Sequence, residues 1–500
     1  MAQNYQKNTP RGLDKTKRAP KIGRLDMYFL VIKEAVLDMF RSDRIRDSLN
    51  QLLDTAQTEC EEMLAEKSKQ DGAKRVYVPR KKSSILPFKT VILQLIISQS
   101  KSLYGEMTSS LLFSHDHIPT VSAFVQRLKL IHEDVFYHLF TGFVEENYWN
   151  HINIYEDRFY GVDGTSKTYP GTIYEESYHV SPGKENAKEH NEMHGNALYS
   201  LNEHMFLDII IQPVHEKDER DALLTFMDRV AHRFESSYEA RTHSIFVDDR
   251  GYESWAVIAR ACKHDLGLIC RCKDPDSNGL LAGIRDLLPE NYKDLEWMDT
   301  TLDVTLTRSA KRKFLSNYVY LNTNQRCDEC TPDQDFAVTL RVVKVPLSKT
   351  TSEYMVVINL NPRIYTAKVL KSKYFLRWGL EIGFMGLKEA CCLNSPHGLS
   401  SESIRKEFIA KLILYDISAC FAYYKMPSES TLKLTPKTKH EYEVTFSDTV
   451  ADVRRYLAVN ENYDLDEIVQ KHRRPVRPDR PSKPRVKRAK LTPYTNHKSS

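Results

Sequence analysis

The chain has 500 residues, of which 41% are hydrophobic and 28% charged, and its formal net charge is +5. This composition is typical of a globular protein of about three domains and excludes a mainly disordered chain. The sequence has no long uninterrupted apolar run and no apolar segment near its basic N-terminus, so we expect neither a membrane span nor a signal peptide. The expected location is the cytoplasm.

Nine cysteines, an odd number, favour reduced thiols over a disulfide framework. Cys327 and Cys330 form a Cys-x-x-Cys pair, which supplies half of a zinc site. Two further ligands would be needed, and the candidates are Cys391, Cys392 and His397. Whether this pair binds zinc stays open from the sequence.

The first part of the chain divides into an arm and a helical region. Residues 1–24 carry seven positive charges against one acid, Asp14, with two prolines that interrupt any helix, so we expect a flexible basic arm. Residues 25–155 have helical apolar spacing and are predicted to form a DNA-binding domain. Within it, residues 118–129 form either the second helix of a helix-turn-helix or one more packed helix.

From Arg158 the apolar period changes to that of strands. Residues 159–165 are predicted to form a short strand that carries Asp163. The elements expected next are strands over 196–201 and 205–212, a helix over 218–234, a strand over 244–247, a helix over 253–262 and a strand over 266–272. Together they predict a mixed α/β sheet, with Asp248 and Asp249 at the end of one strand.

The second half begins with a β-rich stretch, residues 274–368, which separates the predicted sheet from a helix over 374–388. A long apolar helix over 401–424 follows and can close the core. The tail, residues 471–500, holds eleven positive charges against Asp479 and five prolines. Such a tail is expected to be disordered and to bind a polyanion, and we favour DNA.

The helix over 374–388 has two contrasting faces. Tyr374, Arg377, Glu381 and Lys388 are spaced 3, 4 and 7 apart, which places them within about 60° of one another on one helix face. The opposite side carries an apolar stripe made by Leu376, Leu380, Gly383, Leu387 and Ala390. The polar face is therefore free to contact a ligand.

Three carboxylates lie where an active site of a mixed sheet would need them: Asp163 on a strand, Asp249 at a strand end and Glu381 on the helix. Carboxylate oxygens are the ligands that Mg²⁺ or Mn²⁺ requires, and three of them together would repel one another without a cation. Two such metals could activate a water or a 3′-hydroxyl against a phosphodiester. Neighbouring strand residues face opposite ways, so only one of Asp248 and Asp249 can join the site; Asp249 is favoured, and Asp248 would instead cap the next helix or pair with Arg250.

These motifs resemble those of a known family. Asp163-Gly164-Thr165, Asp249-Arg250-Gly251-Tyr252 and the Tyr-x2-Arg-x3-Glu-x6-Lys pattern from Tyr374 to Lys388 are similar to the signature of DDE transposases of the insertion-sequence-four type, the last being the YREK motif. The resemblance runs from about residue 157 to residue 424.

The resemblance implies a ribonuclease H-like catalytic core in two parts, residues 156–273 and 369–430, interrupted by a β-rich insertion at 274–368. The core would be followed by a C-terminal region at 431–470 and the basic tail. Asp163, Asp249 and Glu381 would hold two Mg²⁺ or Mn²⁺ ions, while Tyr374, Arg377 and Lys388, with Arg250 as a further candidate, would contact DNA phosphates. Trp297, Tyr318 and Tyr320 are candidates for an aromatic platform under a flipped base.

The activity that the resemblance implies is cut-and-paste transposition: cleavage at the terminal inverted repeats of a transposon and joining of the 3′-hydroxyls to target DNA. Double-stranded DNA would be the partner, with a homodimer assembled on it, and no membrane or small-molecule substrate is expected. The protein would be DNA-associated, in the nucleoid if the host is prokaryotic. Two alternatives stay open: a catalytically silent DNA-binding regulator, and a metal-dependent nuclease without strand transfer.

Overall fold

The computed structural model describes residues 42–70, 86–100, 102–114, 116–181, 189–347, 351–423, 442–459 and 463–475. The expected basic arm, residues 1–24, and most of the expected basic tail lie outside these ranges. No helix in the part that the structure describes is both long and apolar enough to cross a membrane.

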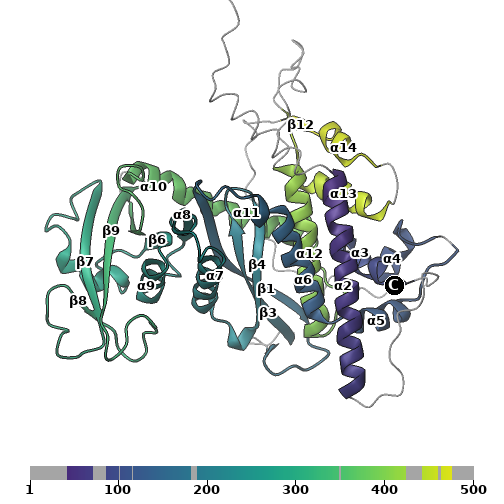
Figure 1. The fold of residues 1–500 in the computed structure, drawn as a ribbon, viewed down its shortest axis with the longest axis horizontal. Coiled ribbons are helices and arrows are strands. Elements are labelled where there is room, and N and C mark those ends of the chain that lie inside the picture. The colour runs from purple at the N-terminus through teal and green to yellow at the C-terminus, as the bar shows by residue number, and fades with distance from the viewer. Residues whose placement is uncertain are drawn as a thin grey trace, which may run out of the picture.

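One large sheet organises the molecule (Figure 1). Its strands, in chain order, are β1 (Arg158–Pro170), β2 (His179–Val180), β3 (His190–Ser200), β4 (Met205–Pro213), β5 (Ser244–Asp248), β6 (Gly267–Cys272), β7 (Met298–Thr307), β8 (Tyr318–Tyr320), β9 (Phe336–Pro346) and β10 (Ser352–Ile358). Within the described ranges these ten strands lie in the order β2-β3-β1-β5-β6-β10-β9-β7-β8, with β4 also paired to β3. The mixed α/β sheet predicted from the sequence is therefore confirmed.

The pairing within this sheet is mixed. β1, β3 and β4 are joined as antiparallel neighbours, whereas β5 and β6 run parallel to β1. β10 then pairs antiparallel with β6, and β9 pairs antiparallel with β10. The β-rich stretch over 274–368 thus extends the central sheet, because β10 pairs with β6 along five residue pairs from Tyr354↔Cys272 to Ile358↔Leu268.

Two groups of helices cover the two faces of the sheet near β1. α11 (Trp378–Glu389) and α12 (Ser401–Ala422) cover one face, where a Cβ on Gly161 would touch Leu380 and one on Gly195 would touch Phe408. α7 (Glu219–Arg233) covers the opposite face, and α9 (Trp255–Lys263) packs against α7, β6 and β10. α8 (Tyr238–Thr242) leads into β5.

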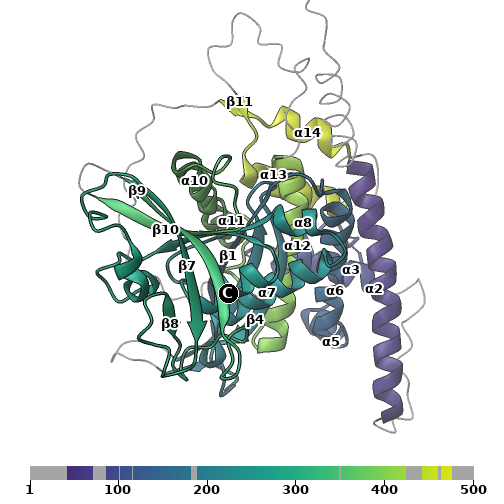
Figure 2. The ribbon, with the colours of Figure 1, turned by 60° about the vertical axis from the view of Figure 1, so that its left-hand side comes forward.

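A helical layer packs on the far side of α12. Its members are α2 (Ser42–Gln70), α3 (Phe88–Ile97), α4 (Leu103–Ser109), α5 (Val121–Lys129), α6 (Glu133–Asn147), α13 (Phe446–Ala458) and α14 (Leu465–Lys471). α12 contacts α3, α6 and α13 (Figure 2). Nearly all of its residues from Ile404 to Phe421 are buried. The helical content predicted for the first 155 residues is confirmed where the structure describes them.

Two predictions about elements are wrong in detail. The helix expected over 374–388 is interrupted: α10 (Ala367–Tyr374) ends before a 3₁₀ turn at Phe375–Arg377, and α11 follows. The basic tail does not begin at Lys471, because Arg474–Pro475 form a strand, β12, that pairs with β11 (Tyr442–Glu443). The Arg474 guanidinium also donates to Asp448 at 2.7 Å, which holds this segment on α13.

Candidate active site

The first two predicted carboxylates lie on neighbouring parallel strands. Asp163 is within β1, and Asp249 comes directly after the last residue of β5. The printed pairing of the two strands ends at Tyr160 and Phe246, and the same register continued by three residues would place Asp163 beside Asp249. Because successive strand residues alternate between faces, Asp248 points to the other face. The register therefore favours Asp249 over Asp248 as the partner of Asp163.

Asp248 has none of the roles expected for it. Its carboxylate is fully buried, both of its oxygens lack a hydrogen-bond partner among the described residues, and burial raises its pKa well above the ordinary value. The cap of α9 is Ser254, whose side chain accepts a hydrogen bond from the Val257 N–H. Arg250, two residues after Asp248, is exposed.

The third carboxylate, Glu381, is at the start of α11, where its side chain is exposed at the same end of the sheet. Arg377 precedes it by one turn and donates a hydrogen bond to Glu381 Oε1 at 2.6 Å. Arg377 is 8% exposed, and its positive charge opposes the rise that burial causes in the pKa of both Asp163 and Asp248. Arg377 is therefore the central positive charge of the acidic site.

Asp249 is held by two residues from other elements. Tyr374, at the end of α10, donates its hydroxyl to Asp249 Oδ1 at 3.2 Å, and Arg271 of β6 lies 3.6 Å from the same oxygen. Tyr374 is buried, with 7% of its surface exposed. In the 3₁₀ turn after Tyr374, residues three apart are eclipsed, so Tyr374 and Arg377 lie on the same side, with the Arg377 guanidinium 5.9 Å from the Tyr374 ring. Arg377 in turn pairs with Glu381 one helical turn later, so these three residues share one polar face, as predicted, despite the change of helix type.

Asp163 is approached from both sides of the sheet. Burial raises the pKa of its carboxyl, and the charges of Glu219 on α7 and Glu381 on α11 raise it further. The hydrogen bond from the Gly164 N–H and the charge of Arg377 lower this pKa and partly offset the rise. Burial lowers the pKa of Lys388, a half-buried residue of α11, and the charge of Asp163 offsets part of this lowering. Arg377 and Lys388 thus act on carboxylates near the ends of β1 and β5, Arg377 on Glu381 and Lys388 on Asp163.

A family model for the transposase DDE domain matches residues 155–417. This range covers more than half of the chain. The chain belongs to the DDE transposase family. No protein among those with curated functions matches it.

The DDE domain, as matched, begins just before β1 and ends within α12, so it contains Asp163, Asp249, Glu381 and the β-rich stretch. Among solved structures, the chain is similar to the piggyBac transposase in a synaptic complex with hairpin DNA, at 8% sequence identity and a TM-score of 0.38. That match covers 85% of this chain and 80% of the other.

The donor chemistry of the DDE domain suits a hard divalent cation, since the site offers carboxylate oxygens alone. In the part of the chain that the structure describes, however, no three His, Cys, Asp or Glu side chains lie close enough together to hold a metal ion. Arg377 contacts Glu381, and Arg271 with Tyr374 contacts Asp249, so basic and phenolic groups lie between the carboxylates. Like charges repel, and these groups offset that repulsion.

The same search bears on the cysteine pair. Cys327 and Cys330 are buried, and all nine cysteines are free thiols. Cys327 lies 3.7 Å from Glu329 Oε2, but no third ligand of the four types completes a metal group with the pair among the described residues.

The sequence motifs suggested no role for three residues near the predicted carboxylates. Glu219 and Tyr252 lie near Asp163, as the effects of their charges on one another indicate, and Arg271 contacts Asp249. Tyr252 belongs to the Asp-Arg-Gly-Tyr motif, but the motif alone suggests no role for it. Glu219 had one usable signal: it is in the first turn of the helix that follows β4, close to the strand ends.

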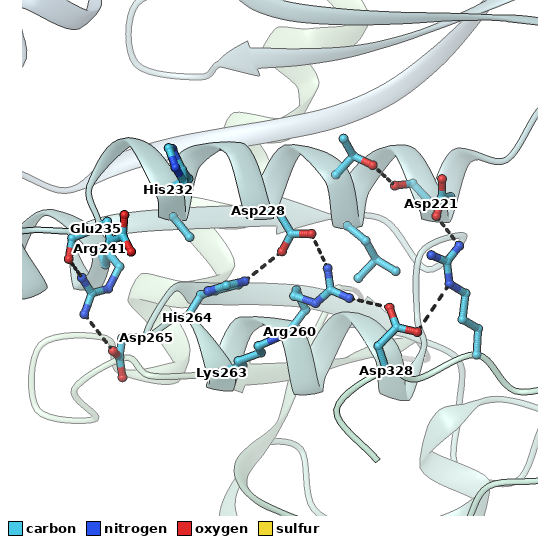
Figure 3. Close-up of a pocket in the computed structure, with 14 residues that line it drawn as sticks. Asp221, Asp228, His232, Glu235, Arg241, Arg260, Lys263, His264, Asp265 and Asp328 are labelled. Atoms are coloured by element: carbon cyan, nitrogen blue, oxygen red, sulfur yellow. Dashed lines mark hydrogen bonds and ion pairs between the residues drawn. The ribbon is translucent and has the colours of Figure 1, made fainter. Parts of the chain in front are cut away.

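A hollow of the DDE domain lies elsewhere, between α7 and α9 (Figure 3). It measures about 670 Å³, and none of the predicted site residues line it. Arg260 crosses it, donating to Asp328 at 2.9 Å and to Asp228 at 2.5 Å, and it also contacts Glu329. These ion pairs join the loop at 326–330 to both helices, so the hollow is a structural junction.

A second hollow, of about 550 Å³, lies at the start of α9. Of the three aromatic candidates, only Tyr320 lines it, together with Arg220, Lys273 and Arg326. Trp297 and Tyr320 are each about two-fifths exposed, whereas Tyr318 is half-buried.

Proposed function

We propose that this chain is a cut-and-paste DNA transposase whose catalytic carboxylates are Asp163, Asp249 and Glu381. The observation that supports the proposal is the parallel register of β1 and β5 within the DDE domain, which ends at Tyr160↔Phe246 and would align Asp163 with Asp249 if it continued. Glu381 approaches the same strand ends on α11, with Arg377 against it. The order β4-β3-β1-β5-β6, antiparallel at first and parallel at its end, supports a ribonuclease H-like core.

In this proposal Asp163, Asp249 and Glu381 hold two Mg²⁺ or Mn²⁺ ions, which when bound would activate the attacking oxygen and stabilise the departing one. The protein positions these carboxylates through its own contacts. Tyr374 and Arg271 orient Asp249, the Gly164 N–H orients Asp163 at 2.8 Å, and Arg377 orients Glu381 at 2.6 Å.

The proposed DNA contacts differ in accessibility. Arg250 is exposed beside Asp249, and Lys388 is half-buried near Asp163, so both can reach a phosphate at the strand ends. Tyr374 and Arg377 are buried against Asp249 and Glu381, so they would contact only a phosphate that lies directly on those carboxylates. We propose that double-stranded DNA is the partner and that a homodimer assembles on it, because two transposon ends need two active sites.

The test is incubation of the full chain with Mg²⁺ and linear DNA that carries its own terminal repeats. Both 3′-end nicks and products joined to target DNA are expected. Binding without nicks would instead indicate a silent DNA-binding regulator, and nicks without joining would indicate a nuclease. Asp163→Asn and Glu381→Gln should abolish nicking while end binding survives, since these groups hold metal and not DNA; a Glu381→Gln variant that cuts normally would overturn the assignment.

A further inference from the structure

Arg271 of β6 is shared between two carboxylates, and one of them belongs to the β-rich stretch. Its Nη1 lies 3.6 Å from Oδ1 of Asp249, beyond hydrogen-bond distance, whereas its Nη2 makes a close ion pair with Oε1 of Glu353 on β10. The side chain of Glu353 is 11% exposed, while that of Asp249 is 37% exposed. The more deeply buried carboxylate thus takes the closer contact with the guanidinium.

The register of the sheet brings these three side chains to one face. Arg271 pairs with Met355, and Glu353 lies two residues before Met355 on the same side of β10. Such diagonal neighbours on antiparallel strands are within reach of long side chains. The parallel register of β5 and β6, continued by one residue, would place Asp249 beside Arg271 on that face. A residue of the β-rich stretch therefore reaches the predicted site through one arginine.

Asp249 is held through one of its two carboxylate oxygens. The Arg250 N–H at 2.8 Å, the Tyr374 hydroxyl at 3.2 Å and the Arg271 guanidinium all contact Oδ1. No residue that the structure describes donates a hydrogen bond to Oδ2. The second oxygen is therefore open to a ligand, as the partial exposure of this side chain allows.

An arginine with a single carboxylate partner behaves differently in the same stretch. Arg341 of β9 and Asp299 of β7 have the same diagonal relation in the pairing of their strands. Here the guanidinium takes both oxygens of the carboxylate, with Nε 3.1 Å from Oδ1 and Nη2 2.6 Å from Oδ2. Such two-pronged pairs are common for arginine. Without Glu353, Arg271 would be free to close on both oxygens of Asp249 in the same way.

We propose that Glu353 is a positioning residue of the active site: it holds the Arg271 guanidinium back, so that one oxygen of Asp249 stays open to an incoming ligand. This inference rests on the proposed function, in which Asp249 is a catalytic carboxylate. One positive charge shared by two carboxylates leaves part of the negative charge of Asp249 uncompensated. The β-rich stretch then contributes to the active site through β10, and does not only extend the sheet.

The first test measures stability and needs no activity. Urea unfolding of the full chain, D249N, R271Q and the double variant gives the coupling between these two residues, and the same set is measured in the E353Q background. The coupling should change the unfolding equilibrium constant by about twofold in the unchanged chain and by about fivefold in the E353Q background, within the range of partly exposed ion pairs. Equal coupling in both backgrounds would overturn the proposal.

D299N is the matched control. It removes the carboxylate of the other diagonal pair with an arginine, and the coupling between Asp249 and Arg271 should stay as in the unchanged chain. A larger coupling in the D299N background as well would mean that the change is a general effect on the sheet, which also overturns the role of Glu353.

The second test measures cleavage of end-repeat DNA. E353Q should cleave about tenfold more slowly, the usual size of the effect when a group that supports an active-site carboxylate is lost. R271Q/E353Q should regain part of that rate, because the guanidinium that covers Asp249 is then absent, whereas a merely structural role of Glu353 gives no such rescue. Glu353→Asp, which keeps the charge, should lose less than E353Q and replaces it if E353Q does not fold.

The two tests separate the possible failures. If the unchanged chain cleaves and E353Q cleaves as fast, or R271Q/E353Q is no faster than E353Q, only this inference is overturned. If the unchanged chain does not cleave, the proposed function fails. The stability coupling then still decides whether Glu353 holds Arg271 back from Asp249.

Discussion

Adjacent aspartates at the end of β5 have opposite surroundings, and their variants should differ accordingly. Asp249 is partly exposed and held by Tyr374 and Arg271, whereas Asp248 is fully buried without a hydrogen-bond partner among the described residues. We predict that Asp249→Asn abolishes DNA cleavage. Asp248→Asn should keep cleavage and change the stability little, because burial favours the neutral Asp248 carboxyl and the isosteric amide would be as unpaired as the acid.

Cleavage assays on end-repeat DNA and urea unfolding of both variants check this prediction. The two substitutions make the same chemical change one residue apart, so each serves as the control for the other. The opposite result, with Asp248→Asn inactive and Asp249→Asn active, would mean that β5 shifts its register by one residue at the active site.

At the scale of one element, α11 contains a matched pair of glycines. A Cβ on Gly383 would lie 2.9 Å from the Tyr199 ring, which packs between α11 and α12, whereas a Cβ on Gly379 would meet its nearest neighbour, His204, at 3.5 Å. We predict that Gly383→Ala destabilises the protein by about 1–3 kcal/mol, because an overpacked core must shift. It should also lower cleavage, since α11 carries Glu381.

Gly379→Ala is the control on the same helix. It should be neutral or stabilising by up to about 1 kcal/mol, because alanine favours a helix over glycine and finds room there. Urea unfolding midpoints measure both effects. Equal stability of the two variants would mean that α11 does not pack tightly against Tyr199.

The apolar face of α11 could be predicted from the sequence, but the turn that precedes this helix could not. The apolar stripe of α11 could be predicted, and Leu380, Gly383 and Leu387 are indeed buried. The 3₁₀ turn before Trp378 could not, because no proline or glycine marks it and it depends on how α10 packs on β9. The predicted face nevertheless persists, because residues three apart are eclipsed in the 3₁₀ turn and Arg377 pairs with Glu381 one turn later.

On the scale of the whole molecule, the order of strands and helices around the site could be predicted because their apolar periods are clear. Two features could not. The β-rich stretch joins the central sheet because β10 pairs with β6, and such pairing between distant segments leaves no local pattern. The His194 ring lies over Gly164, where a side chain on that residue would collide with it, and from there it reaches Glu219 on α7. No local sequence pattern indicates this contact.

His397, in the loop between α11 and α12, joins the helical layer to the DDE domain and should make stability depend on pH. Its ring nitrogens lie 3.7 Å from Glu106 of α4 and 3.7 Å from Glu407 of α12. Burial lowers its pKa, but hydrogen bonds and charges of the two glutamates outweigh burial and raise the pKa to about 10. The folded chain thus binds this proton more tightly than the unfolded chain, whose histidine has a pKa of about 6.5.

The sign follows from that difference: the stabilisation is complete below about pH 6.5 and is lost as the pH rises through about 10. We predict that His397→Gln costs about 1.5–3 kcal/mol at low pH, the usual contribution of hydrogen bonds to charged groups, and that its deficit shrinks toward pH 10. Urea unfolding across this range measures it. His232→Gln, a change at an exposed histidine of α7, should show no such trend. A deficit independent of pH would mean that the ring acts by packing alone.

The distribution of charge along the whole chain leads to the last prediction, which concerns how the protein holds DNA. Removing residues 476–500 deletes eight lysines and arginines and one acid, Asp479. The cut belongs after Pro475, because Arg474–Pro475 pair with Tyr442–Glu443 and belong to the described fold. If these residues contact phosphates, DNA binding should weaken on every sequence alike, and the dependence of log affinity on log salt should become less steep by about 0.9 for each phosphate that the tail neutralises.

Fluorescence anisotropy at several salt concentrations measures this slope. A scrambled tail of the same composition should bind as the natural one does, since phosphate binding depends on charge and not on order. An unchanged slope after truncation would mean that the DNA contacts belong to the helical layer and the strand ends of the DDE domain.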